Sequence, residues 1–317
     1  MRGLFLDIDT VDRGDLDLAG LRATLPEWTF RQSGAGKTGK QPLQADIIVS
    51  NKVDVDADTI NRSANLKLIC IAATGTNNVD LAAAAKQGVP VCNVRNYATA
   101  SVVEHVFSLM LCLARSLPQY LRAVEHGEWQ ASNTFCMLDH PVMELAGRTL
   151  GIIGCGELGN AVAAIGQAIG MQVLMAERRG ETVRHGRTSF DEVLARADII
   201  SLHCPLNADT QNLIGAAELH RMKRDAFLIN TARGGIVNEG ELAEALLSGE
   251  IGGAALDVLT EEPPHTGNPL LSLDLPNLII TPHIAWASSS SRQRLVDEIA
   301  ANIRAFLAGK PRNIVVT

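Results

Sequence analysis

No run of basic residues longer than Arg178-Arg179 occurs in this sequence of 317 residues, whose formal net charge is −7 at pH 7. Nucleic acids and anionic membrane surfaces attract proteins through extended positive charge. We therefore expect neither of them to be the main partner. A small anionic substrate is compatible with the sequence, because it needs only a local positive site.

Long apolar runs and clustered cysteines are also absent. The apolar segments stay below the roughly 18 residues that span a membrane, and the N-terminus carries Asp7 where a signal peptide would have its apolar core. The 6 cysteines are widely spaced and form no C-x-x-C pair, which indicates neither a zinc site nor a disulfide framework. We expect a cytoplasmic protein without a bound metal.

A glycine motif, Gly154-Cys155-Gly156-Glu157-Leu158-Gly159, stands near the middle of the chain. A strand-like segment (148–153) precedes it, a helix-like segment (160–170) follows it, and the next strand-like segment ends in Glu177. A G-x-G-x-x-G motif in this setting is typical of a dinucleotide-binding turn. The alternative is a glycine-rich turn between a strand and a helix that binds no ligand.

Each glycine of the motif has a predicted role. Gly154 allows the tight turn, Gly156 lets a pyrophosphate approach the backbone, and Gly159 lets the helix pack closely on the strand. The N-terminus of the following helix offers unpaired N–H groups to the phosphates. These roles together predict a pyrophosphate site.

The residues after the next strand bear on the choice of cofactor. Glu177 is placed to accept hydrogen bonds from the adenine ribose hydroxyls and should repel a 2′-phosphate, which favours NAD. Arg178 and Arg179 follow at once and could attract a 2′-phosphate. NAD is therefore the expected cofactor, and use of NADP stays open.

The chain is longer than one compact core usually needs, and a hydrophobic content of 46% can fill two cores. Strand-like runs alternate with helix-like patterns on both sides of the glycine motif, which predicts two parallel sheets covered by helices. The second set has the strand count of a complete dinucleotide-binding sheet. The predicted strands are 3–8, 46–50, 68–73 and 89–93 in the first set, and 149–153, 171–176, 198–203, 226–230, 253–257 and 278–281 in the second.

Two helix-like segments would connect the sheets. Residues 101–113 are apolar on a helical period and predict a buried helix that begins the cofactor domain, whereas residues 291–307 predict an amphipathic helix that returns to the first sheet. The tail, 312–316, can add an edge strand there. The expected fold is α/β, with two doubly wound parallel-sheet domains. A Rossmann NAD-binding domain (99–286) is inserted into a discontinuous, flavodoxin-like substrate domain (1–98 and 287–317).

Residues 122–143 show no clear periodicity and carry Trp129, Phe135 and Met137. An apolar segment of this length suits an arm that reaches over another subunit, which predicts a homodimer. A plain surface loop explains the same sequence equally well.

Three chemically active side chains follow three successive predicted strands of the second sheet. Arg233 comes after the strand at 226–230, Glu262 after the strand at 253–257, and His283 after the strand at 278–281. Ligands bind outside the carboxyl ends of parallel strands, so we expect these side chains to converge at one edge. Taken singly, a surface arginine, a solvated carboxylate and a core histidine are the alternatives.

These residue types suit the reduction of a keto acid by a nicotinamide cofactor. Arg233, a planar and permanent cation, would bind the substrate carboxylate and polarise the carbonyl as negative charge develops on its oxygen. His283 would donate a proton to that oxygen, or remove it in the reverse direction. Glu262 would bind the far imidazole nitrogen and fix the tautomer.

Three strings carry a resemblance to a known family: Asn230-Thr231-Ala232-Arg233-Gly234-Gly235, Leu256-Asp257-Val258 leading to Glu262-Pro263, and Thr281-Pro282-His283-Ile284-Ala285-Trp286. In this order and spacing they resemble the D-isomer-specific 2-hydroxyacid dehydrogenases, and the resemblance covers essentially the whole chain. The His-Ile-Ala-Trp ending is most similar to the glycerate dehydrogenase, or hydroxypyruvate reductase, branch.

The resemblance implies the same three catalytic roles and adds further positions. The loop 73–80 is similar to the family's substrate loop, in which the amides of Thr74 and Gly75 would hold the substrate carboxylate, and Arg233 and His283 are the other predicted substrate-binding residues. The predicted cofactor-binding residues are Gly154, Gly156, Glu157, Leu158, Gly159, Glu177, Arg178, His203, Cys204, Pro205, Thr231, Ala232 and Asp257.

The expected function is hydride transfer between NAD(P)H and a small 2-keto acid or D-2-hydroxy acid, with hydroxypyruvate or glyoxylate as the keto acid. The reaction would take place in a cleft that closes about hinges near 93–100 and 285–290. Two alternatives stay open: a cofactor-binding regulator without catalysis, and a D-2-hydroxyacid dehydrogenase for another substrate, such as phosphoglycerate.

Overall fold

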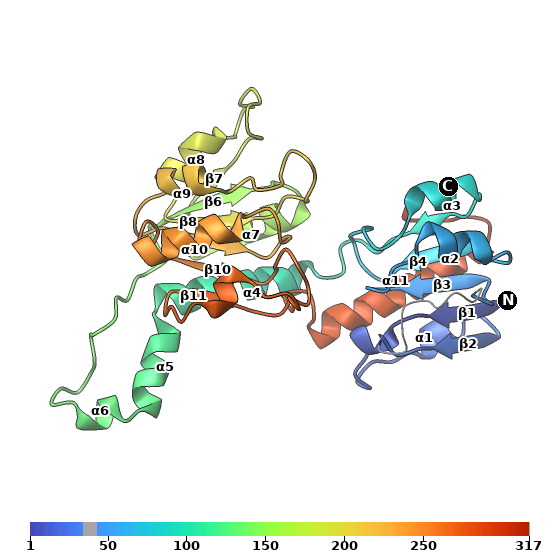
Figure 1. The fold of residues 1–317 in the computed structure, drawn as a ribbon, viewed down its shortest axis with the longest axis horizontal. Helices are drawn as coiled ribbons and strands as arrows, with labels where there is room; N and C mark the ends of the chain where they lie inside the picture. Colours follow the sequence, from blue (N-terminus) through green and yellow to red (C-terminus); the bar gives the residue numbers. More distant parts are fainter. Residues whose placement is uncertain (34–42, 317) are drawn as a thin grey trace. The chain divides into compact units, whose positions relative to one another are not determined.

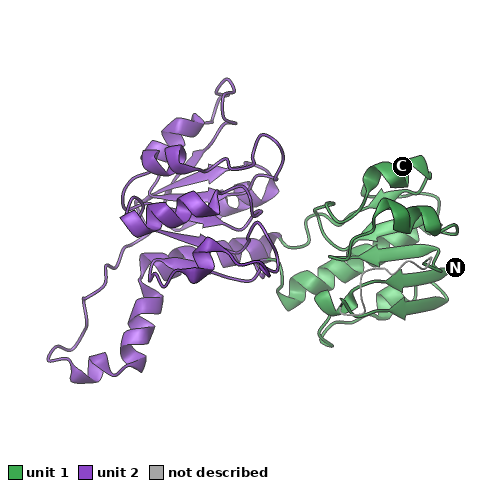
Figure 2. Cartoon of the chain, viewed as in Figure 1, with its two compact units in different colours: residues 1–98, 286–317 green, residues 99–285 purple. Residues whose placement is uncertain are grey.

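A computed structural model describes residues 1–33 and 43–316, and the chain divides into two compact units (Figure 2). Unit 1 comprises Met1–Ala98 and Trp286–Thr317, and unit 2 comprises Thr99–Ala285. Trp286, predicted as the last residue of the second domain, belongs to unit 1. The physical reason is that its ring packs edge to face on Tyr97, with the ring centroids 6.3 Å apart.

The sheet of unit 1 has the strand order β12-β5-β4-β3-β1-β2. The first five strands are parallel in the flavodoxin-like order 2-1-3-4-5, and β12 pairs antiparallel with β5 as the predicted edge strand. The sequence analysis missed β2, because this four-residue edge strand alternates between exposed and half-buried residues. The strands are β1 (Arg2–Phe5), β2 (Glu27–Phe30), β3 (Ile47–Ser50), β4 (Leu68–Ile71), β5 (Val91–Cys92) and β12 (Ile314–Val316).

Helices cover both faces of this sheet. Successive residues of a strand point to opposite faces, so Phe5 packs in the cluster that contains Ile299 of α11, and Leu4 packs in the cluster that contains Ile60 of α2. The central strands β3 and β4 are buried throughout for this reason. The helices are α1 (Ala19–Arg22), α2 (Ala57–Arg62), α3 (Leu81–Lys86) and α11 (Ser289–Leu307), preceded by a 3₁₀ turn at Ile8–Thr10.

The sheet of unit 2 has six parallel strands in the order β11-β10-β9-β8-β6-β7. The chain runs outward from β6 to β7, then returns past β6 to β8 and winds the other way. The switch point therefore lies between β6 and β8, where doubly wound sheets bind their ligands. The strands are β6 (Thr149–Ile153), β7 (Gln172–Met175), β8 (Ile199–Leu202), β9 (Phe227–Asn230), β10 (Gly253–Leu256) and β11 (Leu278–Ile280).

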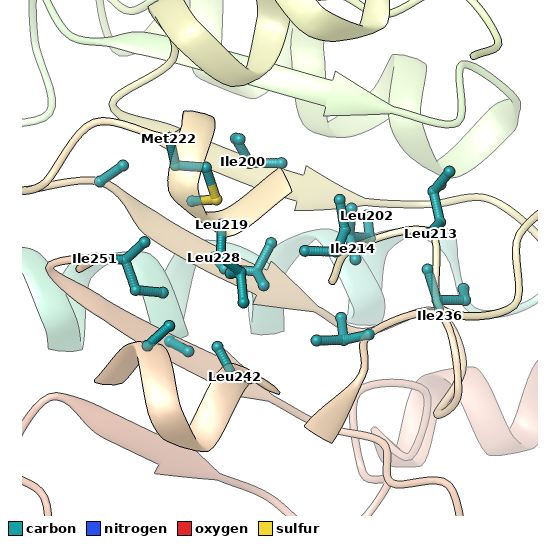
Figure 3. Close-up of a cluster of buried hydrophobic side chains, with 14 of the residues drawn as sticks. Ile200, Leu202, Leu213, Ile214, Leu219, Met222, Leu228, Ile236, Leu242 and Ile251 are labelled. Carbon is teal, nitrogen blue, oxygen red and sulfur yellow. The ribbon is translucent and has the colours of Figure 1, made fainter. Parts of the chain in front are cut away.

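The core of unit 2 joins its strands to the covering helices. Figure 3 shows Ile200 and Leu228 of the sheet close to Leu219 of α9 and Leu242 of α10. The predicted buried helix is α4, which contacts α7, β9 and β10. The helices are α4 (Thr99–Ala114), α5 (Leu117–Glu125), α6 (Glu128–Ala131), α7 (Glu157–Ala168), α8 (Phe190–Arg196), α9 (Ala216–Arg221) and α10 (Glu239–Ser248), with a 3₁₀ turn at Pro269–Ser272.

Helices α5 and α6 project from the body of unit 2 (Figure 1). We call residues 117–143 the arm. Residues 122–143 show no clear periodicity in the sequence, but α5 continues to Glu125. The Tyr120 hydroxyl donates a hydrogen bond to the His140 carbonyl at 2.8 Å, which ties α5 to the returning chain. The arm is thus an ordered projection built from two segments that support each other.

Among residues 1–33 and 43–316, no single helix is long and apolar enough to cross a membrane, although the bent pair of α4 and α5 passes that test on length and composition alone. Most of the apolar side chains of α4 are buried in unit 2. The cytoplasmic location stays a prediction from the sequence.

Candidate active site

His283 and Glu262 form a hydrogen-bonded pair at the carboxyl edge of the unit 2 sheet. The imidazole Nδ1 lies 2.5 Å from Glu262 Oε2, and the other carboxylate oxygen accepts a hydrogen bond from the Leu259 amide at 2.9 Å. A carboxylate only accepts hydrogen bonds, so Nδ1 carries a proton and Nε2 is left for another partner. The arrangement can move a proton at Nε2 while Nδ1 stays fixed.

The backbone of His283 has a left-handed conformation, with φ at 55°. Its amide donates to the carbonyls of Asp257 and Thr281 at 2.8 and 3.0 Å, which holds the residue in this conformation. Non-glycine residues adopt such a φ rarely, and they do so where surrounding contacts enforce it. The end of β10 therefore orients the imidazole that follows β11.

Asp257 connects these elements through its side chain. The buried carboxylate accepts hydrogen bonds from the Thr281 hydroxyl at 2.5 Å and from the amides of Ile284 and Ala285 at 2.9 and 2.8 Å. Burial opposes its ionisation, but the contacts with His105, Thr281 and these amides outweigh burial and hold the pKa of Asp257 below its ordinary value. Through these contacts Asp257 clamps the loop that carries His283, and its predicted role in cofactor binding stays a prediction.

Two members of this cluster, His105 and the Thr281 hydroxyl, were not predicted from the sequence. His105 Nε2 lies 3.0 Å from that hydroxyl and 3.5 Å from Asp257 Oδ1. His105 sits in the apolar pattern of α4, where a single histidine gives no signal that separates it from a core residue. Only the packing of α4 against β10 brings it to the clamp.

Arg233 lies in the turn after β9, next to β10 in the sheet. Asn230 shapes this turn, because its side-chain amide donates to the Arg233 carbonyl at 2.9 Å and its side-chain oxygen accepts from the Ala232 amide at 3.0 Å. At Gly234 a Cβ would lie 1.9 Å from the Leu259 carbonyl oxygen. The arginine turn therefore packs directly on the loop that leads to Glu262.

The glycine motif forms a close turn between β6 and α7. Gly154 has φ at +98°, and a Cβ there would lie 2.4 Å from the backbone of His203 and Cys204. At Gly159 a Cβ would lie 2.0 Å from the Gly154 carbonyl oxygen, whereas at Gly156 it would meet nothing within 4 Å. Two glycines thus allow tight packing, and the third leaves open space beside the N-terminus of α7, as a pyrophosphate site requires.

A cavity of about 800 Å³ opens beside this turn within unit 2. It is lined by the glycine loop, by Glu177 and Arg178 after β7, and by His203, Cys204 and Pro205 after β8. Residues predicted to bind the adenosine half of a dinucleotide therefore share one cavity. Glu157 and Leu158 begin α7, and Thr231 and Ala232 follow β9, further along the same edge.

Two buried polar atoms at this edge, Thr231 Oγ1 and His203 Nδ1, have no hydrogen-bond partner among the described residues. Buried polar groups are usually paired, so such atoms indicate contacts that a ligand supplies. The open space at Gly156, the cavity and these two atoms all fit a bound dinucleotide.

Thr74 and Gly75 belong to unit 1 and follow β4. The Thr74 hydroxyl donates to the Val94 carbonyl at 2.8 Å, and the Asn93 amide donates to the Thr74 carbonyl at 2.7 Å. The predicted substrate loop is therefore tied to the segment after β5, at the carboxyl edge of its own sheet. Its role in binding the substrate carboxylate stays a prediction.

Residues 107–285 match the family description "D-isomer specific 2-hydroxyacid dehydrogenase, NAD binding domain". The chain belongs to this family. The predicted family is thereby confirmed, the matched residues form the NAD-binding domain of that family, and the protein is an oxidoreductase of the 2-hydroxyacid dehydrogenase type.

Whole-length relatives of this dehydrogenase agree with the family. It is 46% identical to a glycerate dehydrogenase of Methylorubrum extorquens, over 95% of this chain and 97% of that protein. It is 35% identical to a hydroxypyruvate reductase of Blautia hydrogenotrophica, over 99% of both chains. A crystal structure of a protein from Thermus thermophilus superimposes over 100% of both chains, with a TM-score of 0.87 and 33% identity.

Two substitutions in the glycine loop are expected to differ in their effects. Gly156→Ala should leave the melting temperature unchanged but weaken NADH binding at least about tenfold, because its methyl group occupies the space for the pyrophosphate. Gly159→Ala should destabilise the protein by about 1–3 kcal/mol, since α7 must move away from β6. Thermal unfolding and NADH fluorescence titration measure both effects. Unchanged NADH affinity in Gly156→Ala would contradict the assignment.

His203 is expected to make stability depend on pH. Burial lowers the pKa of His203 from 6.5 to about 4. Between these values the unfolded chain binds more protons, so the contribution of His203 is fully present above pH 6.5 and is lost as the pH falls toward 4, by at most about 3 kcal/mol. Urea unfolding at several pH values should show a smaller acid loss in His203→Gln than in the wild type. A variant of the exposed His126, His126→Gln, should behave as the wild type; equal losses in all three proteins would refute the prediction.

Proposed function

We propose that this dehydrogenase reduces hydroxypyruvate, glyoxylate or a similarly small 2-keto acid to the corresponding 2-hydroxy acid, the D isomer where the product is chiral, with a reduced nicotinamide cofactor. The observation that carries the chemistry is the 2.5 Å pair of His283 Nδ1 and Glu262 Oε2, next to the arginine turn. The substrate class rests on the glycerate dehydrogenase and hydroxypyruvate reductase that resemble the chain along its whole length.

The proton in this proposal moves at His283 Nε2. When bound, the nicotinamide cofactor supplies or accepts the hydride. Because Glu262 holds Nδ1–H, the protonated imidazole can donate from Nε2 to the carbonyl oxygen of the keto acid, and neutral Nε2 can accept the hydroxyl proton in the reverse direction. The negative charge of Glu262 stabilises the protonated imidazole from which the proton is donated.

The substrate carboxylate is the part that the remaining residues recognise. Arg233 supplies a planar fork that can bind the carboxylate through two hydrogen bonds and polarise the neighbouring carbonyl. The amides of Thr74 and Gly75 are the proposed partners of the same carboxylate in unit 1. An aldehyde that matches the keto acid but lacks the carboxylate should therefore be a poor substrate.

The test is the loss of nicotinamide absorbance when purified protein is mixed with hydroxypyruvate or glyoxylate and NADH or NADPH. Rapid oxidation with one of these acids, and none with the matching aldehyde that lacks the carboxylate, would support the proposal. Cofactor binding without turnover of any small 2-keto acid would contradict it and favour a cofactor-binding regulator. The joint presence of Arg233, Glu262 and His283 at one edge speaks against a regulator.

Phosphoglycerate is the second candidate substrate. A phosphate would need a further cation near Thr74 and Gly75, and the loop 73–80 contains none. The same assay with 3-phosphohydroxypyruvate separates the two, since we expect a kcat/KM well below that for hydroxypyruvate.

We also propose that the arm mediates a homodimer. Phe135 and Leu138 at its far end are 91% and 82% exposed, and Trp129 and Leu121 are more than half exposed. Such a patch on an ordered projection is typical of a subunit contact. Light scattering at micromolar concentration should give twice the chain mass, and Phe135→Asp with Leu138→Asp should give the monomer mass. A monomeric wild type would overturn the proposal.

A further inference from the structure

Glu177, the acid expected to bind the adenine ribose, is already occupied by an arginine of its own chain. Arg184 Nε lies 2.6 Å from one carboxylate oxygen, and Arg184 Nη2 lies 2.6 Å from the other. The amides of Arg178 and Arg184 donate to the same oxygens at 3.0 and 3.4 Å. Arg184 and Glu177 therefore form a bidentate ion pair, and each carboxylate oxygen of Glu177 accepts two hydrogen bonds.

Glu177 and Arg184 differ in how much of each side chain is exposed to a ligand in the cavity. The Glu177 side chain is 2% exposed, whereas that of Arg184 is 68% exposed. Hydrogen bonds from Arg184 and from the Arg178 amide lower the pKa of Glu177 to about 2, so it keeps its negative charge at neutral pH. A buried acid thus sits beneath a guanidinium group that cancels its charge and faces the cavity.

More positive charge surrounds this pair. Arg178, Arg179 and Arg187 also line the cavity, together with the acids Glu181 and Asp209. Arg179 pairs with Glu218 at 2.8 Å, whereas Arg178 and Arg187 form no ion pair with a described residue. Arg187 Nη1 is buried without a hydrogen-bond partner among the described residues. A buried, unpaired guanidinium nitrogen in a cavity wall indicates an anionic ligand there.

We propose that Arg184 determines the cofactor preference of this dehydrogenase, and that by neutralising Glu177 it allows the cavity to bind the 2′-phosphate of NADPH. An unpaired acid at this position would repel the phosphate and accept the ribose hydroxyls instead. With Arg184 across it, the acid offers no free oxygen to a ribose, and Arg184, Arg178 and Arg187 are the cavity-lining cations available to a phosphate. The proposal deepens the proposed function, on which it rests for the cofactor site.

Nucleotide binding tests the proposal without any turnover. Adenosine 2′,5′-bisphosphate and AMP differ only in the 2′-phosphate, and calorimetric titration gives the ratio of their affinities. In the wild type the bisphosphate should bind at least about tenfold more tightly, as expected for one charge-assisted contact. Arg184→Ala should reverse the ratio, because it removes a cation and exposes Glu177. Glu177→Gln should raise the ratio above that of the wild type.

Arg196→Ala is the matched control, since Arg196 pairs with Glu192 on the surface of α8 and does not line the cavity. It should keep the wild-type ratio. The proposal is overturned if the wild type binds AMP as tightly as the bisphosphate, or if Arg184→Ala keeps the wild-type ratio with an unchanged melting temperature. The ratio of nucleotide affinities does not depend on turnover. The proposed keto-acid reduction and the proposed role of Arg184 can therefore fail separately.

Discussion

Replacing His283 with glutamine is expected to lower kcat for keto-acid reduction by about 10²–10⁴-fold, the usual contribution of general acid catalysis. Glutamine keeps a hydrogen-bonding side chain of similar size but cannot transfer a proton at the position of Nε2. NADH affinity should change little, because the cavity assigned to the adenosine half of the cofactor does not include His283. Stopped-flow oxidation of NADH and a separate fluorescence titration measure the two quantities.

His220 provides the matched control. Its Nδ1 lies 2.6 Å from Glu250 Oε1, so it forms the same type of pair on the exposed surface, away from the ends of β9, β10 and β11. His220→Gln should retain wild-type kcat. Glu262→Gln should retain partial activity, because the glutamine oxygen can still accept a hydrogen bond from Nδ1 but lacks the negative charge that stabilises the protonated imidazole. Wild-type kcat in His283→Gln would remove His283 from the mechanism.

The second large effect is expected at Arg233. Arg233→Gln should lower kcat/KM for hydroxypyruvate by about 10³-fold or more, through a higher KM and a lower kcat together, because the cation is needed both for the carboxylate and for the charge that develops on the carbonyl oxygen. Arg233→Lys should recover part of this loss, since it restores the charge without the planar fork.

Arg224 serves as the control for the second prediction. Its side chain lies on the surface of unit 2 and donates to the Gly249 carbonyl, at 3.3 Å. Arg224→Gln should leave both parameters unchanged. If Arg233→Gln raised KM but kept kcat, Arg233 would bind the substrate without polarising its carbonyl, and the proposed mechanism would need another electrophile.

Much of the fold could be predicted from the sequence because its signals are local. A strand buried on both faces is a short apolar run, and each of the ten predicted runs overlaps a strand, which is shorter than the run in every case except 149–153. The edge strand β2 was not predicted, because a half-exposed strand of four residues contains no apolar run. The helical continuation through residues 122–125 was missed as well, since an exposed projection does not show one buried stripe.

The candidate site divides in the same way. Gly154, Arg233, Glu262 and His283 could be selected because each follows a recognisable strand, and parallel strands bring their carboxyl ends to one edge. By itself the sequence determined the α/β class and the family, and it selected the residues to which the proposed chemistry is assigned.

Only the tertiary structure decided how these residues are held and which of them are free to act. His105 reaches Asp257 through the packing of α4, and Arg184 reaches Glu177 across an irregular segment. Neither contact leaves a periodic mark in the sequence, because each depends on where two separate segments meet. The acid that the sequence offered to the ribose is therefore shielded by an arginine, and the aspartate that it offered to the cofactor holds the histidine loop in place.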